Sequence, residues 1–303
     1  MRTTLFPAGV VMGRLFDRTW SVTVSTLDVS QFRIHFSITK TLKPEPNKGL
    51  VEIYNLSPDH RQQLEELAPG KRVGKKRKGK TAPNIRGSVP VRIEAGYKDD
   101  GPQLIFLGDL HTVDSELNGA DWITAVSSGD GMRATRTARI NQAFGPKTPA
   151  DVALRALVKS LGIGEGNLSQ VVSQLRLQGT ANLLTRGIVF SGPTARMMTD
   201  FCRSADLEWS IQDGAVQFVD VGKALAQSAL VLSSDSGLIG SPNVDGDGVL
   251  KAKTLMLPGL KCGRLVVVKA RNVQGNFRVE KITTEGDTHS NDQWYHEIEA
   301  KRY

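Results

Sequence analysis

The sequence predicts a mainly β protein with an inserted α/β module. Apolar and polar residues alternate strictly at residues 32–38, which is the period of a strand with one buried face. A helix pattern is followed directly by a hairpin pattern at residues 193–218, and strand patterns return towards the carboxy terminus. We therefore expect three regions along the chain: a β domain at residues 1–130, an α/β helix–hairpin module at residues 131–222, and a β segment at residues 223–303.

The first region contains most of the alternating runs. Strands are predicted at residues 21–24, 32–38, 50–54, 89–97, 104–117 and 123–127. Asn118-Gly119, between the last two runs, is a typical hairpin turn. Ser57 followed by Pro58 predicts the start of a short helix, because Ser caps free amides and Pro suits the first helical position. Pro69-Gly70 is expected to stop that helix.

The middle region changes to helical spacing. Residues 148–151 open a helix whose apolar positions recur every three or four residues. A second helix begins near Pro193, and the two strands after it turn back at residues 213–214. Met197 and Met198 lie on the apolar stripe of the second helix, so we interpret both as core residues rather than ligands.

The last region returns to strand patterning. A continuous apolar strand is predicted at residues 265–268, a turn at residues 274–276 with a strand after it, and a closing strand at residues 294–300. The segment at residues 286–292 is polar and rich in turn-forming residues, so we expect a loop there.

Charge is concentrated in one segment. The chain has 39 Lys and Arg against 31 Asp and Glu, a formal net charge of +8. Eight basic residues with no acid among them equal that excess: Lys71, Arg72, Lys75, Lys76, Arg77, Lys78, Lys80 and Arg86. The rest of the chain is formally neutral, which disfavours a broad basic face for nucleic acid. Two interpretations of this basic loop stay open: a solvated hairpin tip, or an electrostatic contact with an acidic partner or with passing DNA, without sequence specificity.

The basic loop also matches a nucleotide-binding pattern. Residues 74–81 read G-K-K-R-K-G-K-T, which satisfies the P-loop G-x-x-x-x-G-K-T. A working P-loop follows a buried strand and opens a helix, because loop amides and the helix amino terminus hold the phosphates. Here a predicted helix and a Pro-Gly break precede the segment, and Pro83 follows it. We therefore predict no nucleotide cofactor.

No other motif indicates catalysis or a metal site. Residues 243–248 resemble the start of a calcium loop, but Thr254 stands where the bidentate Glu is required, so we expect a polar turn. The histidines lack metal-ligand spacing, and His289 and His296 near two aspartates are only a weak candidate for a surface site. We predict no catalytic residue, no cofactor and no metal site, and hence a protein that is not an enzyme.

Neither a membrane span nor a secretory signal is predicted. No apolar run approaches the roughly 18 residues that cross a bilayer, so no membrane insertion by this chain is expected. The amino terminus lacks a continuous apolar core. The two cysteines, Cys202 and Cys262, are too few for a disulfide framework and suit buried positions in a reducing cytoplasm.

Three segments together carry a family resemblance. They are residues 49–58 (G-L-V-E-I-Y-N-L-S-P) with the later strand I-E-A-G-Y at residues 93–97, the helix–hairpin at residues 193–218, and a final stretch with S-G-L-I-G-S-P at residues 236–242, L-M-L-P-G-L at residues 255–260 and Trp294-Tyr295. In order and spacing they resemble the baseplate hub family of bacteriophage tails, the group that includes the late-control D and XkdQ-type proteins. The basic loop stands where that family often has a short connection.

The resemblance implies a fold and a set of partners. Family members are similar to tail-tube proteins, with β-barrel domains that associate as a homotrimer, and two barrel domains per chain give a pseudo-sixfold ring. The implied role is a structural hub in the virion tail baseplate, assembled in the cytoplasm of the host. Its implied partners are copies of itself, the tail tube or distal tail protein, the spike protein, the tape-measure protein and passing DNA.

Two functions of other classes stay open from the sequence. Hubs can be fused to cell-wall hydrolases, but we expect this chain to be too short for such a fusion, and its middle region lacks a recognisable site. The chain could also be a nucleic-acid-binding protein that acts through the basic loop at residues 71–86.

Overall fold

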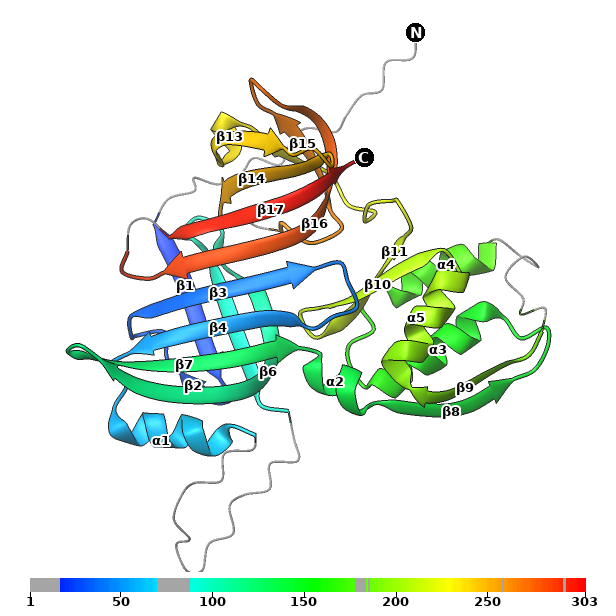
Figure 1. Cartoon of the computed structure of the whole chain (residues 1–303), viewed down its shortest axis with the longest axis horizontal. Coiled ribbons are helices and arrows are strands. Elements are labelled where there is room, and N and C mark those ends of the chain that lie inside the picture. The colour runs from blue at the N-terminus through cyan, green and yellow to red at the C-terminus, as the bar shows by residue number, and fades with distance from the viewer. Residues whose placement is uncertain (1–16, 70–87, 178–183, 185, 258, 291–292) are drawn as a thin grey trace, which may run out of the picture.

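The computed structural model describes residues 17–69, 88–177, 184, 186–257, 259–290 and 293–303. The expected fold class is confirmed: long antiparallel strands dominate and the longer helices cluster in the middle region. Figure 1 shows the strands stacked one above another as a broad curved sheet, with the helices of the middle region gathered at one side of it.

The amino-terminal region forms strands β1 to β7 and helix α1. Their bounds are β1 Arg18–Val24, β2 Leu27–Asp28, β3 Ile34–Thr41, β4 Asn47–Tyr54, α1 Pro58–Leu67, β5 Pro90–Tyr97, β6 Gly101–Asn118 and β7 Asp121–Asp130. The predicted cap is confirmed, because Ser57 Oγ accepts a hydrogen bond from the His60 amide at 3.3 Å. The predicted hairpin is confirmed too, since Asn118 pairs with Asp121 across a two-residue turn.

The middle region contains the helices α2 to α5 and two small ribbons of strands. Their bounds are α2 Met132–Thr137, β8 Arg139–Phe144, α3 Ala150–Leu161, α4 Leu168–Leu177, β9 Ile188–Pro193, α5 Thr194–Ser204, β10 Leu207–Gln212 and β11 Ala215–Asp220. Strand β8 pairs with β9, and β10 pairs with β11. We call this set of elements, α2 to β11, the module.

The carboxy-terminal region is again made of strands. Their bounds are β12 Leu230–Leu232, β13 Leu238–Val244, β14 Val249–Leu255, β15 Leu265–Lys269, β16 Gln274–Asp287 and β17 Trp294–Arg302, with a 3-10 turn at Ser234–Ser236. The turn predicted at residues 274–276 is wrong. Strand β16 already begins at Gln274, and the turn lies just before it, where the Ala270 amide donates to the Val273 carbonyl at 3.0 Å.

Strands from both ends of the chain belong to one 13-stranded sheet. Its order is β13-β14-β17-β16-β3-β4-β7-β6-β5-β1-β2, with β15 also paired to β16 and β12 paired to β15. The two halves join where β3 lies antiparallel to β16, with Ser37 opposite Glu285 and Thr39 opposite Thr283. The module is inserted between the halves and adds no strand to this sheet.

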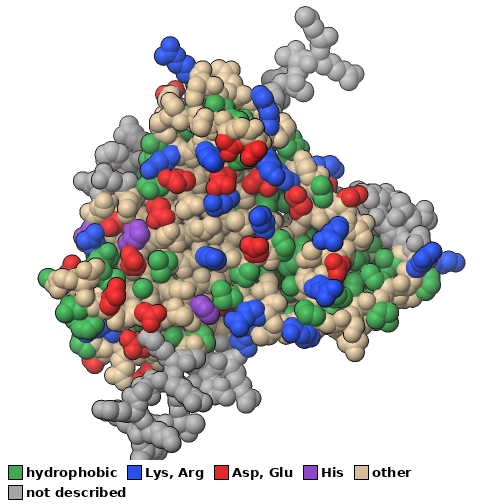
Figure 2. Space-filling model, in the orientation of Figure 1, with side chains coloured by type: hydrophobic (Ala, Val, Ile, Leu, Met, Phe, Trp, Pro, Cys, Tyr) green, Lys and Arg blue, Asp and Glu red, His purple; other side chains and the backbone are tan. Residues whose placement is uncertain are grey.

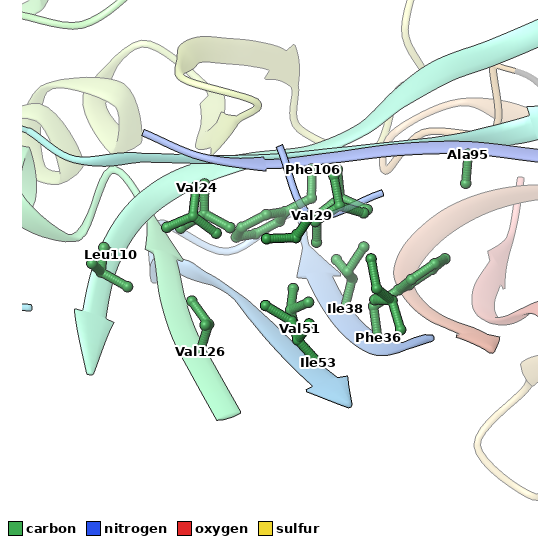
Figure 3. Close-up of a cluster of buried hydrophobic side chains, with 14 of the residues drawn as sticks. Val24, Val29, Phe36, Ile38, Val51, Ile53, Ala95, Phe106, Leu110 and Val126 are labelled. Carbon is green, nitrogen blue, oxygen red and sulfur yellow. The ribbon is translucent and has the colours of Figure 1, made fainter. Parts of the chain in front are cut away.

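The period-two pattern of β3 gives the first core. Ile34, Phe36 and Ile38 all point to one face and are fully buried. They meet side chains from β1, β4, β5 and β7 across the concave side of the sheet, as Figure 3 shows. Phe106 of β6 fills the centre because Gly49 leaves room for it: a Cβ at Gly49 would lie 2.7 Å from the Phe106 ring.

Two further cores lie in the module and in the carboxy-terminal strands. In the module, Leu154, Met198 and Phe201 pack against the β10–β11 ribbon, and Met197 packs at the edge of the cluster. Both methionines are therefore core residues, as predicted. In the carboxy-terminal strands, Val266 and Phe277 are central. None of the helices within the described ranges is long and apolar enough to span a bilayer.

Candidate functional site

The predicted contact residues of the basic loop lie outside the described residues. These residues are Lys71, Arg72, Lys75, Lys76, Arg77, Lys78, Lys80 and Arg86. Their contact with an acidic partner or with DNA stays a prediction. The described chain brings charged residues together elsewhere, at the joint between the module and the sheet.

At the joint, the turn of the β10–β11 ribbon meets the end of β7. The Asp130 carboxylate accepts hydrogen bonds from the Asp213 and Gly214 amides at 2.6 and 2.9 Å. Both turn residues have positive φ angles, 54° and 80°, and such a turn lets successive amides converge on one anion. The sequence predicted a turn at residues 213–214 but not that Asp130 accepts hydrogen bonds from its amides.

A buried ion pair completes the joint. Lys40 Nζ of β3 lies 2.5 Å from Asp213 Oδ1, and both side chains are largely buried. Burial raises the pKa of Asp130 to about 6, although the Gly214 amide and Lys40 favour its charged form. The joint therefore holds two carboxylates and one ammonium group away from water.

Amide side chains extend this network along the same contact. Asn47 Nδ2 donates to the Ile211 carbonyl at 2.7 Å, and Gln212 Nε2 donates to the Thr41 carbonyl at 2.7 Å. The Thr41 amide in turn donates to Asn47 Oδ1 at 2.9 Å. The β3–β4 turn and the module are thus linked by reciprocal hydrogen bonds, which fix the orientation of the ribbon on the sheet.

A second tie connects the module to the carboxy-terminal strands. Arg278 of β16 donates to Glu208 of β10 at 2.7 Å and to Glu280 at 2.7 Å. It also donates to the Lys223 carbonyl at 3.0 Å. Burial lowers the pKa of Arg278, but the carboxylates of Glu208 and Glu280 raise it by more, so the net shift is upward. The module is therefore held by both halves of the sheet.

Two clefts of about 390 and 370 Å³ flank the joint. Polar side chains that line the larger cleft are already engaged by the fold. Asn167 bonds to both the amide and the carbonyl of Phe218, and Gln217 Nε2 donates to the Cys262 carbonyl at 3.0 Å. Asn167 thus holds the start of α4 to β11 within the module, and Gln217 attaches the module to the segment at Cys262.

Comparison with known families decides the identity of the chain. The family model described as Baseplate hub gp41 matches residues 19–297. The chain belongs to this baseplate hub family. The resemblance inferred from the three sequence segments is therefore confirmed. A search of curated proteins found no match.

Solved structures share the fold of this hub protein. The 43 kDa tail protein of prophage MuSo2 from Shewanella oneidensis matches with a TM-score of 0.61 at 11% identity, over 94% of this chain and 98% of that one. A tail protein from Neisseria meningitidis MC58 matches with 0.61 at 10% identity, over 95% and 97%. The Escherichia coli c3393 protein, a component of the type VI secretion system, matches with 0.53 at 10% identity, over 93% and 76%.

A polar network covers the seam between the two halves of the hub sheet. His35 of β3 lies 3.1 Å from Glu52 of β4 and 3.5 Å from Glu285 of β16. Arg33 pairs with Asp287 at 3.0 Å. Hydrogen bonding to Glu285 raises the pKa of His35, which burial would otherwise lower. The network ties three adjacent strands that come from opposite ends of the chain.

Both cysteines and His296 of this hub protein are buried. Burial raises the thiol pKa of Cys202 and of Cys262 to about 12, so neither is a thiolate at neutral pH. His296 is fully enclosed and burial lowers its pKa to about 3. It hydrogen-bonds Thr284 at 2.7 Å, whereas His289 is exposed, so the structure does not bring the two histidines into one site. Within the described ranges no group of three His, Cys, Asp or Glu is arranged to hold a metal.

Proposed function

We propose that this hub protein is structural and not an enzyme, and that it forms a homotrimeric, pseudo-sixfold ring which joins the tail tube to the spike and lets DNA pass. The family match over residues 19–297 carries this proposal. The shared fold with phage tail proteins and with a chain of a Francisella PdpA–VgrG complex, at a TM-score of 0.55, supports it.

The sheet supports association because several of its strands are paired on one side only. In the described structure β13 and β2 end the sheet order, and β12 pairs with β15 alone. Ile239 and Val231, on β13 and β12, are 37% and 41% exposed. Unpaired edges and exposed apolar side chains favour contacts with other chains, and closure into a ring protects them.

The proposed partners follow the resemblance. They are two further copies of the chain, the tail tube or distal tail protein, the spike protein and the tape-measure protein, in the baseplate of a virion tail assembled in the host cytoplasm. We further propose the division at residues 1–130, 131–222 and 223–303, and a contact of the basic loop, residues 71–86, with DNA or an acidic partner.

The ring is tested by the mass of the purified chain in solution. Size-exclusion chromatography with light scattering should give about three times the chain mass of 33.0 kDa, and electron microscopy of that fraction should show rings. A strict monomer at every concentration, and also in the presence of the spike protein, would contradict the proposal. Release of peptidoglycan fragments by the purified chain would contradict the non-enzymatic part alone.

A further inference from the structure

Charge in this chain is segregated, although outside the basic loop it sums to neutrality. Residues 88–130 contain two Lys or Arg and eight Asp or Glu, whereas residues 131–205 contain ten and three. The sign changes where the chain leaves β7 and enters the module. In Figure 2 red and green side chains lie at the end of the sheet that carries the β6–β7 hairpin, whereas over the module the charged side chains are mostly blue, among much green.

The module presents a basic strip on three adjacent elements. Arg155 and Lys159 of α3 are exposed on the same helix face as Val152, which is 42% exposed. Arg139 of β8 lies beside them, because Ser160 Oγ of α3 donates to its carbonyl at 3.0 Å. Arg139 also donates to the carbonyl of the exposed Arg136 at 3.2 Å. We call Arg136, Arg139, Arg155 and Lys159, with Val152, the basic strip.

The hairpin of β6 and β7 presents the opposite character. Asp114, Glu116 and Asp121 share one face of it, and Asp59 is exposed in the first turn of α1 close by. On the other face Leu117 and Trp122 lie opposite each other and are 59% and 39% exposed. The Arg61 guanidinium of α1 lies over the Trp122 ring at 3.8 Å, so Leu117 is the more open of the two, and a large apolar side chain that stays this exposed often marks a contact surface. We call these six residues the acidic tip.

We propose that the acidic tip of one copy docks on the basic strip of the next copy. The two surfaces lie at opposite ends of the molecule in Figure 1, so they cannot meet within one chain. Complementary surfaces at opposite ends make a heterologous contact, which closes into a ring when the rotation fits. Val152 is exposed within the basic strip, whereas Leu117 is exposed on the hairpin face opposite to Asp114 and Glu116, so complementary charge carries the proposed contact.

A second copy fits better than DNA as the occupant of the basic strip. The chain itself supplies the opposite charge, because the carboxylates of the acidic tip are exposed on every copy at the other end of the molecule from the basic strip. The contact rests on the proposed ring and specifies which surfaces form it. It also gives a function to the separation of acidic residues at 88–130 from basic residues at 131–205, which lies outside the basic loop.

Charge reversal on each surface tests the contact. One variant carries Arg136→Glu, Arg155→Glu and Lys159→Glu, and the other carries Asp59→Lys, Asp114→Lys and Glu116→Lys. Arg139 and Asp121 are left unchanged because Arg139 donates to the Arg136 carbonyl and Asp121 accepts from Asn55. Arg155 also pairs with Asp151 at 3.9 Å, so the stability of the strip variant is measured beside its assembly. Each variant should dissociate at a concentration at least tenfold higher than the unaltered chain, because like charges then face each other.

The decisive variant combines all six substitutions. Because it restores opposite charges across the contact, it should form the trimer again by light scattering. The matched control reverses Lys269, Arg271 and Lys301, three exposed cations of the carboxy-terminal strands, and should leave the trimer intact. Thermal unfolding of every variant separates loss of assembly from loss of fold.

The other outcomes overturn the proposal in distinguishable ways. If both triple variants remain trimers, the tip-to-strip contact is wrong and the ring stands. If the variant with all six substitutions is folded but stays monomeric, the two surfaces do not face each other. If the strip reversal leaves the trimer intact but removes retention on DNA, the occupant is DNA. An unaltered chain that is always a monomer removes the proposed function itself.

Discussion

Lys40 Nζ lies 2.5 Å from Asp213 Oδ1, although 173 positions separate the two residues in the sequence. The pair joins strand β3 to the module, and the Asp130 carboxylate accepts hydrogen bonds from two amides of the turn that holds Asp213. Charges taken out of water stabilise a protein only while they are paired and hydrogen-bonded. Lys40 is the only cation within this cluster of described residues, so the joint depends on it.

Lys40→Met should therefore destabilise the fold. It leaves two carboxylates buried without their cation, and we expect the free energy of unfolding at pH 7 to fall by about 3–5 kcal/mol in urea titrations. Burial already raises the pKa of Asp130 in the folded chain to about 6, above its ordinary 3.8. Ionisation of Asp130 therefore lowers the stability of the fold as pH rises from about 3.8 towards 6. At pH 5 most of Asp130 in the folded chain still carries its proton, so Lys40→Met should lower the free energy of unfolding less than at pH 7.

The control for this variant is Lys43→Met, an exposed lysine three positions away. It should change the free energy of unfolding by less than about 0.5 kcal/mol. Equal losses at Lys40 and Lys43, or a loss at Lys40 that does not vary between pH 5 and pH 7, would show that the joint does not depend on this charge.

Local patterns predicted most strands of the amino-terminal region, missed β8, β9, β12, β13 and β14, and gave no sign of the joint. Strand β3 could be read because one buried face imposes period two on Ile34, Phe36 and Ile38. No local pattern marks Lys40 or Asp130 as a partner of the turn at residues 213–214, because these contacts depend on how distant segments pack.

Of the four module elements that the sequence did not predict, α2, β8, α4 and β9, two show different causes. Helix α4 was missed although Leu168, Val171 and Val172 stand at helical spacing, so the signal was present. Strand β8 offers no alternation, since three of its central residues are exposed in succession, and only tertiary packing reveals it. The separation of acidic from basic residues is present in the sequence, but the net charge outside the basic loop is zero and does not show it.

The pH dependence of stability should be set in part by His296. Burial lowers its folded pKa to about 3, whereas the unfolded chain takes up a proton near pH 6.5. The unfolded state therefore binds more protons between these values, and stability should fall as pH drops from 6.5 towards 3. His296→Gln should flatten this decline in urea titrations between pH 6.5 and pH 4, while His289→Gln, at an exposed position, should not.

His35 should act in the opposite direction. Its hydrogen bond to Glu285 raises its folded pKa above 6.5, so its stabilising charge is fully present below pH 6.5 and is lost as pH rises through the folded value. Proton–carbon NMR of the imidazole should give a pKa above 6.5 in the unaltered chain. Glu285→Gln should lower that value, whereas Glu299→Gln, a neighbouring carboxylate paired with Lys281 instead, should leave it unchanged.

The packing of Phe106 against Gly49 predicts a coupled pair of substitutions. Gly49→Ala places a methyl group 2.7 Å from the Phe106 ring, and we expect a loss of about 1–3 kcal/mol in the free energy of unfolding. Phe106→Leu alone opens a cavity and should also destabilise the fold. In the double variant the smaller side chain leaves room for the new methyl group, so the combined loss should be at least about 1 kcal/mol less than the sum.

Gly246→Ala is the matched control for this pair, because a Cβ at that glycine meets no atom within 4 Å. Its effect should stay near zero and should add to that of Phe106→Leu without coupling. Simple additivity of Gly49→Ala and Phe106→Leu would mean that the sheet, and not the ring, absorbs the added methyl group. In that case strand β4 must shift relative to β7, which amide exchange at Leu50 and Ser127, opposite each other in the register, would detect.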